Sequence, residues 1–160
     1  MQEINLEQFH QLKQKTEQQY KEIHHVYCPA LKDTIVFNSN GFHHLRYDST
    51  RAERSKRTQM NKFRCLPDAI TILKKSTTIQ EYRRSLCTIG ESDKNGLKKT
   101  NIVEWFACFA IVSFTNHTRI KVIIRRIGGN AGQYHFWSVM PFWTLGNNSK
   151  IIGPKDIEDA

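Results

Sequence analysis

The feature that most constrains the fold of this 160-residue chain is an apolar run in its second half. Residues 103–114 are almost wholly apolar, which is typical of a central β-strand covered on both faces. Residues 119–128 then alternate between apolar and basic side chains, as expected of a strand with one face buried. The two segments therefore predict neighbouring strands of an antiparallel sheet.

Other strands are predicted on both sides of this pair. Residues 34–37 read as a short strand that ends in a turn at 38–41, and residues 79–86 read as another strand, followed by a polar loop at 90–96. The glycine-rich segment 128–132 is typical of a hairpin loop and leads into a last strand at 133–140.

Three segments carry helical patterns. Residues 3–26 form an amphipathic pattern that Asn5 can cap and that the Cys28-Pro29 step should end, with its apolar stripe packing against the sheet. A basic helix is predicted from Ser49 or Thr50 to Phe63. Pro67 should begin a further helix that runs through Lys75.

Helices followed by an antiparallel meander indicate an α+β fold, with N-terminal helices packed on a small antiparallel sheet of about four strands. The chain is 39% hydrophobic, which suffices for one core and one domain. We expect an N-terminal helix at 1–32 packed on the domain, a core at 33–144, and a loose polar C-terminal tail at 145–160.

Several features argue for a cytoplasmic protein that does not contact a membrane. The N-terminus has no apolar region typical of a signal peptide, and the longest nearly uncharged stretch, 105–116, is too short to span a bilayer. The four cysteines lie 37, 22 and 21 residues apart, which matches neither a zinc knuckle nor a dense disulfide framework. They are expected to be reduced and mostly buried.

The net charge of +9 is concentrated in the middle of the chain. Residues 43–126 hold 18 Lys and Arg against 7 Asp and Glu, a net +11, whereas the flanks together carry −2. A basic zone on a folded domain captures polyanions such as RNA. The alternative is a solvated basic surface that serves solubility alone.

Metal-independent RNA cleavage needs a base, an acid and cations, and three histidines lie where they could contribute. His43 and His44 precede Arg46 at the start of the basic segment. A hairpin of the last two strands would bring Arg125 or Arg126 close to His135, depending on the register. Alternatively, one of His43 and His44 packs under the sheet while the other faces water, and His135 is a half-buried strand residue.

Other chemistries have less support. The chain contains no phosphate-binding loop of the P-loop type, and carboxylates are sparse in the basic region, which argues against a two-metal nuclease. Histidine and cysteine lack ligand spacing, so we expect no metal and no cofactor.

Several short motifs resemble a ribonuclease family. They are Phe37, Gly41-Phe42-His43-His44-Leu45, Cys65-Leu66-Pro67-Asp68-Ala69-Ile70, Glu104-Trp105-Phe106, the strand from Ile120 to Arg125, and the strand from His135 to Met140. Between Thr34 and Pro141 the chain resembles the phage and mobile-element branch of the barnase–EndoU–colicin–RelE group. That branch carries a his-leu motif after its first strand, a leu-leu-pro helix and a final gly-x-x-his-phe-x-ser-val strand.

The resemblance implies a helix-plus-four-strand fold and metal-independent RNA cleavage by toxins or phage-borne effectors. Its motifs favour His44 or the neighbouring His43, Arg125, His135 and Ser138 as site residues. In a regular strand His135 and Ser138 face opposite sides, so both can serve one site only if a bulge lies between them.

We therefore expect a cytoplasmic endoribonuclease in which His43 or His44 and His135 share base and acid roles. Arg46 and Arg125 would stabilise the transition state. Cations of the basic segment would hold the RNA backbone: Arg51, Arg54, Lys56, Arg57, Lys62 and Arg64. The alternatives are a non-catalytic RNA- or DNA-binding protein, and an interaction module whose basic face binds an acidic partner such as an antitoxin or immunity protein.

Overall fold

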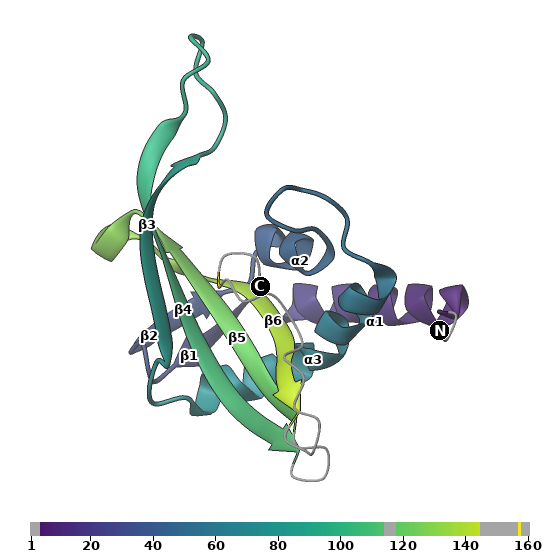
Figure 1. The fold of residues 1–160 in the computed structure, drawn as a ribbon. Helices are drawn as coiled ribbons and strands as arrows, with labels where there is room; N and C mark the ends of the chain where they lie inside the picture. The colour runs from purple at the N-terminus through teal and green to yellow at the C-terminus, as the bar shows by residue number, and fades with distance from the viewer. Residues whose placement is uncertain (1–3, 114–117, 145–156, 158–160) are drawn as a thin grey trace.

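A computed structural model describes residues 4–113, 118–144 and 157, which form three α-helices and one six-stranded mixed sheet. The strand order is β1-β2-β6-β5-β4-β3, with α1 and α3 on one side of the sheet and α2 beside β6 (Figure 1). The α+β class is confirmed, whereas the sheet is larger than the predicted four strands and is not wholly antiparallel. Of the expected tail 145–160, only residue 157 lies within the described residues.

The two strands outside the predicted meander come from the N-terminal third of the chain. Helix α1 (Leu6–Ile23) is capped by Asn5, whose side chain accepts hydrogen bonds from the next turn, as predicted. The helix ends at His24, which has a φ of 55°, so strand β1 (His25–Cys28) occupies part of the predicted helix. Alternate side chains of β1 are buried, and this burial stabilises a strand there instead of another helical turn.

Strand β2 (Asp33–Val36) makes the sheet mixed. It pairs with β1 in the antiparallel sense and with β6 in the parallel sense, where Val36 lies opposite His135. A parallel partnership between segments about one hundred residues apart leaves no local pattern in a sequence. The sequence consequently predicted the strand but not its neighbours.

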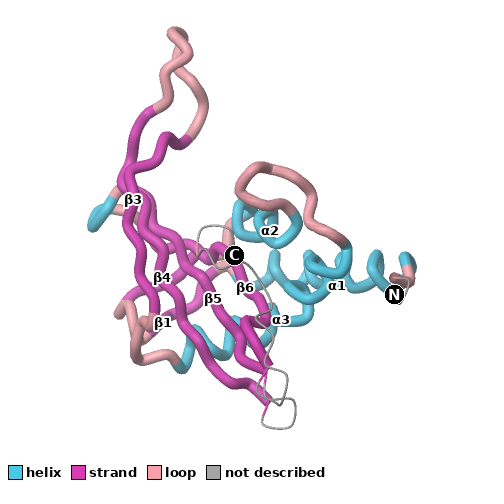
Figure 2. The backbone as a smooth tube through the Cα atoms, in the orientation of Figure 1, coloured by secondary structure: helices cyan, strands magenta, loops and turns pink. Residues whose placement is uncertain are grey.

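The predicted antiparallel meander is confirmed. It consists of β3 (Glu81–Ile89), β4 (Lys99–Ser113), β5 (Thr118–Ile127) and β6 (Tyr134–Thr144), and the loop between β3 and β4 projects beyond the sheet (Figure 2). Arg125 of β5 lies opposite His135 of β6. The pairing then shifts by one residue, so that Trp137 has no partner and forms a bulge.

Helix α2 (Ser39–Arg46) replaces the turn predicted at 38–41. Asn38 caps it by accepting hydrogen bonds from the backbone N–H groups of Asn40 and Gly41, so the polar cluster begins a helix. Gly41 permits close packing, because a Cβ there would lie 2.3 Å from Tyr20 Oη and 2.5 Å from the carbonyl oxygen of Phe136. The his-leu motif therefore lies within a helix that packs directly on β6.

Helix α3 (Lys56–Lys75) is a single helix, whereas two were predicted. It begins after Ser55, which accepts a hydrogen bond from Thr58 N, and not at Ser49 or Thr50. The segment before it is a loop in which Asp48 Oδ1 accepts hydrogen bonds from two backbone N–H groups, an alternative to helix that Asp favours. Pro67 lies inside α3 on an exposed face, where the carbonyl that loses its partner can be hydrated.

Apolar side chains pack on both faces of the sheet. The larger cluster joins the three helices to one face, and α1 contributes to it through the ring contact of Phe9 with Phe63 on α3 and of Tyr20 with Phe136 on β6. A smaller cluster on the other face includes Ile157, which is buried, so this residue of the predicted loose tail is packed. None of the helices in the described ranges is long and apolar enough to cross a bilayer.

Candidate nucleic-acid cleft

A cleft of about 630 Å³ lies between α2 with its following loop and the sheet face that carries the smaller apolar cluster. The sheet side comes from β3, β4, β5 and β6, and the mouth includes the start of the β3–β4 loop. Its polar and aromatic lining includes His43, His44, Asp48, Arg51, Lys98, Trp105, Arg125 and Trp137. Four of the predicted site residues, His43, His44, Arg51 and Arg125, thus share one cavity.

The indole of Trp137 is the centre of a three-layer stack in this cleft. The His44 ring lies nearly parallel to it with centroids 4.1 Å apart, and Arg125 Cζ lies 3.5 Å from the indole centroid. Two groups so close to one centroid cannot share a face without clashing, so His44 and Arg125 cover opposite faces. Trp137 is the unpaired residue of the bulge, and the pairing of β6 with β5 shifts by one residue there.

His44 is held by its neighbours and is 3% exposed. Its Nε2 lies 3.3 Å from Arg54 Nη2, and Arg54 Nε donates to the carbonyl oxygens of His44 and Tyr47. Arg54 therefore stabilises the C-terminal end of α2, and few of its N–H groups remain to donate hydrogen bonds to RNA. This arrangement matches the alternative in which one histidine packs inward while the other faces solvent, and His44 is the inward one.

His43 is the exposed member of the pair. Its ring stacks on Tyr47 at a centroid distance of 4.3 Å and lines the cleft. Arg46 also lies against Tyr47, donating from Nη2 to the phenol oxygen at 3.3 Å, and it is not among the lining residues. Of the three predicted site residues on α2, His43, His44 and Arg46, only His43 is both exposed and part of the cleft lining.

Arg125 and His135 lie side by side across the β5–β6 pair. Burial lowers the pKa of Arg125 to about 10, which leaves the guanidinium charged at neutral pH. Burial, and next the charge of Arg125, lower the pKa of His135 below its usual value, which favours the neutral ring. His135 is half-buried and does not itself line the cleft.

Ser138 follows the bulge that the sequence required, but it faces the interior. It is fully buried and accepts a hydrogen bond of 2.8 Å from Lys62 Nζ on α3. Lys62, predicted to hold RNA, is itself 2% exposed. In this conformation neither side chain can reach a bound phosphate.

The other predicted RNA-binding cations are spread over the surface. Arg51 lines the cleft. Lys56 lies near the Phe9 ring of α1, Arg57 is exposed on α3, and Arg64 borders a separate shallow cavity with Asp68. The basic segment therefore does not form one groove, because it divides between a loop and the several faces of α3.

Sequence reasoning did not identify Trp105, Trp137 and Lys98 as lining residues. The Nε1 atoms of both tryptophans are buried and lack an acceptor among the residues that the structure describes. A tryptophan between two predicted site positions, as in His135-Phe136-Trp137-Ser138, is the one signal that could have identified Trp137. Within residues 4–113, 118–144 and 157, no three His, Cys, Asp or Glu side chains form a group that could hold a metal ion.

Comparison of the chain with models of protein families found no match. Searches of curated proteins and of solved structures found none either.

Proposed function

We propose that the chain binds RNA in the cleft and cleaves it there without a metal ion. The observation that carries the proposal is the presence of an exposed histidine, His43, and a stacked arginine, Arg125, in one cavity. Arg51 and Lys98 line the same cavity and add positive charge at its walls. Cations and a titratable imidazole are the groups that transesterification of RNA requires.

Arg125 is suited to bind the scissile phosphate. Its flat face rests on Trp137, and no residue of the described segments accepts a hydrogen bond from it. The N–H groups at the edge of the guanidinium therefore remain available for two phosphate oxygens. Stacking between Trp137 and this side chain fixes its orientation before a ligand arrives, which lowers the entropic cost of binding.

The reaction needs one group to remove a proton and one to supply it. The base takes the proton of the 2′-hydroxyl, the 2′-oxygen attacks phosphorus, and the bond to the 5′-oxygen breaks as the acid protonates that oxygen. A neutral imidazole accepts a proton, and the lowered pKa of His135 favours that form beside Arg125, so it is the base in this proposal. His43, which is exposed to the cleft, is the acid. The products are a 2′,3′-cyclic phosphate and a 5′-hydroxyl.

The test is incubation of the protein with an RNA oligonucleotide in excess EDTA, followed by analysis of the product ends. His43→Ala and His135→Ala should each slow cleavage by about 10²–10⁴, the usual effect of removing an acid or base. Arg125→Gln should slow it and also weaken binding. His10→Ala, which changes an exposed histidine of α1, is the matched control and should cleave normally.

Two results would overturn the proposal: cleavage that requires added Mg²⁺, and full activity of the Arg125→Gln and His43→Ala proteins. RNA binding without cleavage is the second candidate function. Two observations favour it. His135 is not among the residues that line the cleft, and the His44 ring already contacts Arg54 and Trp137. Retention of binding, with no product under any condition, would support this candidate.

A further inference from the structure

We infer that a second RNA-binding surface lies on the opposite face of the sheet from the cleft, at an exposed strip formed by Tyr82, Arg84 and Leu86 of β3. In this surface a base of single-stranded RNA stacks on Tyr82 and a neighbouring phosphate pairs with Arg84. The inference depends on the proposed function in one respect, that the ligand is RNA. The strip, its residues and its test are separate from those of the cleft.

Strand β3 contributes to both faces because successive side chains alternate. Cys87 and Ile89 point to the smaller apolar cluster and line the cleft. Tyr82 lies opposite Phe106 in the β3–β4 pair, and Phe106 belongs to the cluster on the helix side. The strip therefore lies on the helix side, where Tyr82 is 53% and Leu86 72% exposed.

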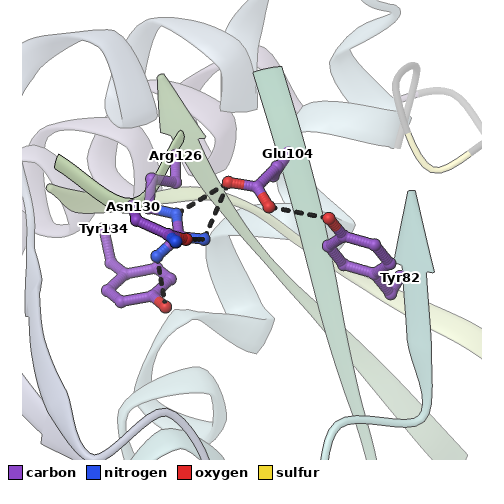
Figure 3. Close-up of polar contacts among 5 residues, drawn as sticks. All are labelled: Tyr82, Glu104, Arg126, Asn130 and Tyr134. Carbon is purple, nitrogen blue, oxygen red and sulfur yellow. Dashed lines mark hydrogen bonds and ion pairs between the residues drawn. The ribbon is translucent and has the colours of Figure 1, made fainter. Parts of the chain in front are cut away.

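A hydrogen-bonded network holds the Tyr82 ring in place (Figure 3). Tyr82 Oη donates to Glu104 Oε1 at 2.7 Å, while Glu104 Oε2 accepts from Arg126 Nε and Nη2, both at 2.8 Å. Arg126 Nη1 in turn donates to Tyr134 Oη at 2.9 Å. The network connects β3, β4, β5 and β6, so it fixes an exposed aromatic ring on a rigid sheet.

The charges of the network leave Arg84 as the cation of the strip. Burial would raise the pKa of Glu104, but hydrogen bonds from Tyr82 and Arg126 outweigh it, and the pKa lies below its usual value. Glu104 is therefore ionised and is neutralised by its ion pair with Arg126. Arg84 is exposed and adds one positive charge beside this neutral pair.

A fixed aromatic ring beside a cation fits a nucleotide better than an apolar protein segment. Tyr82 and Arg84 are two positions apart on one face of a strand, which places them about 7 Å apart, and a single nucleotide spans such a distance between base and phosphate. Base stacking on exposed aromatic side chains, combined with contacts from basic residues, is the common mode of single-strand binding on a sheet. A ring that is already immobilised loses little entropy when a base stacks on it.

The test uses a labelled 2′-O-methyl oligouridylate of about 12 nucleotides, a length within the range of single-strand sites. This probe cannot be attacked by its own 2′-oxygen, so binding is measured without cleavage. Tyr82→Ala should raise the dissociation constant about 5- to 100-fold, the usual effect of losing one stacked base. Tyr82→Trp should restore affinity, and Arg84→Gln should weaken it with a shallower dependence on salt.

Tyr27→Ala provides the matched control, because Tyr27 is 56% exposed on β1, at the opposite edge of the same sheet. It should bind the probe as the unmodified protein does. Thermal unfolding of each variant checks that the fold is intact, and Arg84→Gln removes a residue that forms none of the hydrogen bonds of the network.

Unchanged affinity of Tyr82→Ala and Arg84→Gln would overturn the inference, as would an equal loss in Tyr27→Ala. If Arg125→Gln abolishes binding while the strip variants do not, RNA binds in the cleft and the inference about the strip is wrong. If the strip variants lose affinity but the protein never cleaves RNA, the strip binds RNA and the proposal of catalysis is wrong. Strip variants that bind RNA normally but lose binding to polyglutamate would identify an acidic protein as the partner instead.

Discussion

Lys62 Nζ lies 2.8 Å from Ser138 Oγ in the interior of the protein, and this hydrogen bond joins α3 to β6 directly after the bulge at Trp137. Burial, and next the nearby charge of Arg54, hold the pKa of Lys62 well below its usual value. No carboxylate among the described residues forms an ion pair with this amine. A neutral amine that donates to a buried hydroxyl satisfies both groups without burying a charge.

Lys62→Met should change how stability depends on pH. The unfolded chain binds a proton at Lys62 below about pH 10.4, whereas the folded chain does so only below the lowered pKa. Between these values the unfolded chain binds more protons, so the free energy of unfolding gains up to about 1.4 kcal/mol per pH unit as pH rises. The variant lacks this gain, which urea unfolding between pH 8 and about 10 would measure. Lys74→Met, on the exposed part of α3, should keep the slope, and equal slopes for Lys62→Met and the unmodified protein would mean that Lys62 is charged in the fold.

Gly41→Ala should destabilise the protein by about 1–3 kcal/mol, the usual cost of overpacking. The new Cβ would meet Tyr20 Oη and the backbone of Phe136, and the backbone cannot move without disturbing β6. Because α2 carries His43 and His44, the rate of the proposed RNA cleavage should fall together with stability. Ser39→Ala, which changes an exposed residue of the same helix, should leave both near normal. An unchanged melting temperature in the Gly41→Ala variant would contradict the close packing of α2 on β6.

Phe136→Ala should cost about 3–5 kcal/mol in the free energy of unfolding, as large-to-small changes in a tight core do. Phe136 is fully buried and stacks on Phe37 with centroids 4.6 Å apart. Phe109→Ala should cost less than about 2 kcal/mol, because that ring is half-buried beneath Arg119 and Lys121. Chemical denaturation of both variants measures the difference, and equal losses would mean that the sheet is covered equally at both positions.

Reversing charge in the cleft should weaken RNA binding more than reversing charge elsewhere. Arg51→Glu with Lys98→Glu removes two lining cations, and each lost phosphate contact lowers the slope of log affinity against log salt by about one. Lys56→Glu with Arg64→Glu makes the same charge change on residues outside the cleft. Titration of 2′-O-methyl RNA at several KCl concentrations gives the slopes. Equal slopes for the two double variants would show that RNA responds only to net charge.

The local patterns of the sequence predicted the elements of the C-terminal half well. The apolar run and the alternating strand after it became β4 and β5, and the glycine-rich loop joined β5 to β6. These segments were identified as strands because apolar runs and alternation are local patterns, although Lys121 on the predicted basic face of β5 is buried. In the N-terminal half, the sequence predictions were wrong near two residues that can cap a helix. Asn38 begins a helix where a turn was predicted, and Asp48 stabilises a loop where a helix was predicted to begin at Ser49 or Thr50.

The candidate site could be predicted only in part. Sequence reasoning placed His43, His44 and Arg125 together, and the structure brings them into one cleft. It could not separate the roles of the two histidines, because neighbouring residues in a helix point about 100° apart and only the packing of α2 on β6 decides which one is buried. It also could not find Lys62 in the interior, since a lysine in a basic segment reads as exposed.

By itself, then, the sequence determined the four strands of the antiparallel meander, most of α1, the α+β class, and the set of basic and imidazole groups available to a polyanion. The tertiary structure alone decided the parallel pairing of β2 with β6, the register that sets Arg125 opposite His135, and the bulge that inserts Trp137 between His44 and Arg125. The physical reason is the range of the interactions. Periodicity and capping act over a few residues, whereas strand register, bulges and the burial of a single polar side chain depend on free energies of packing between segments far apart in the chain.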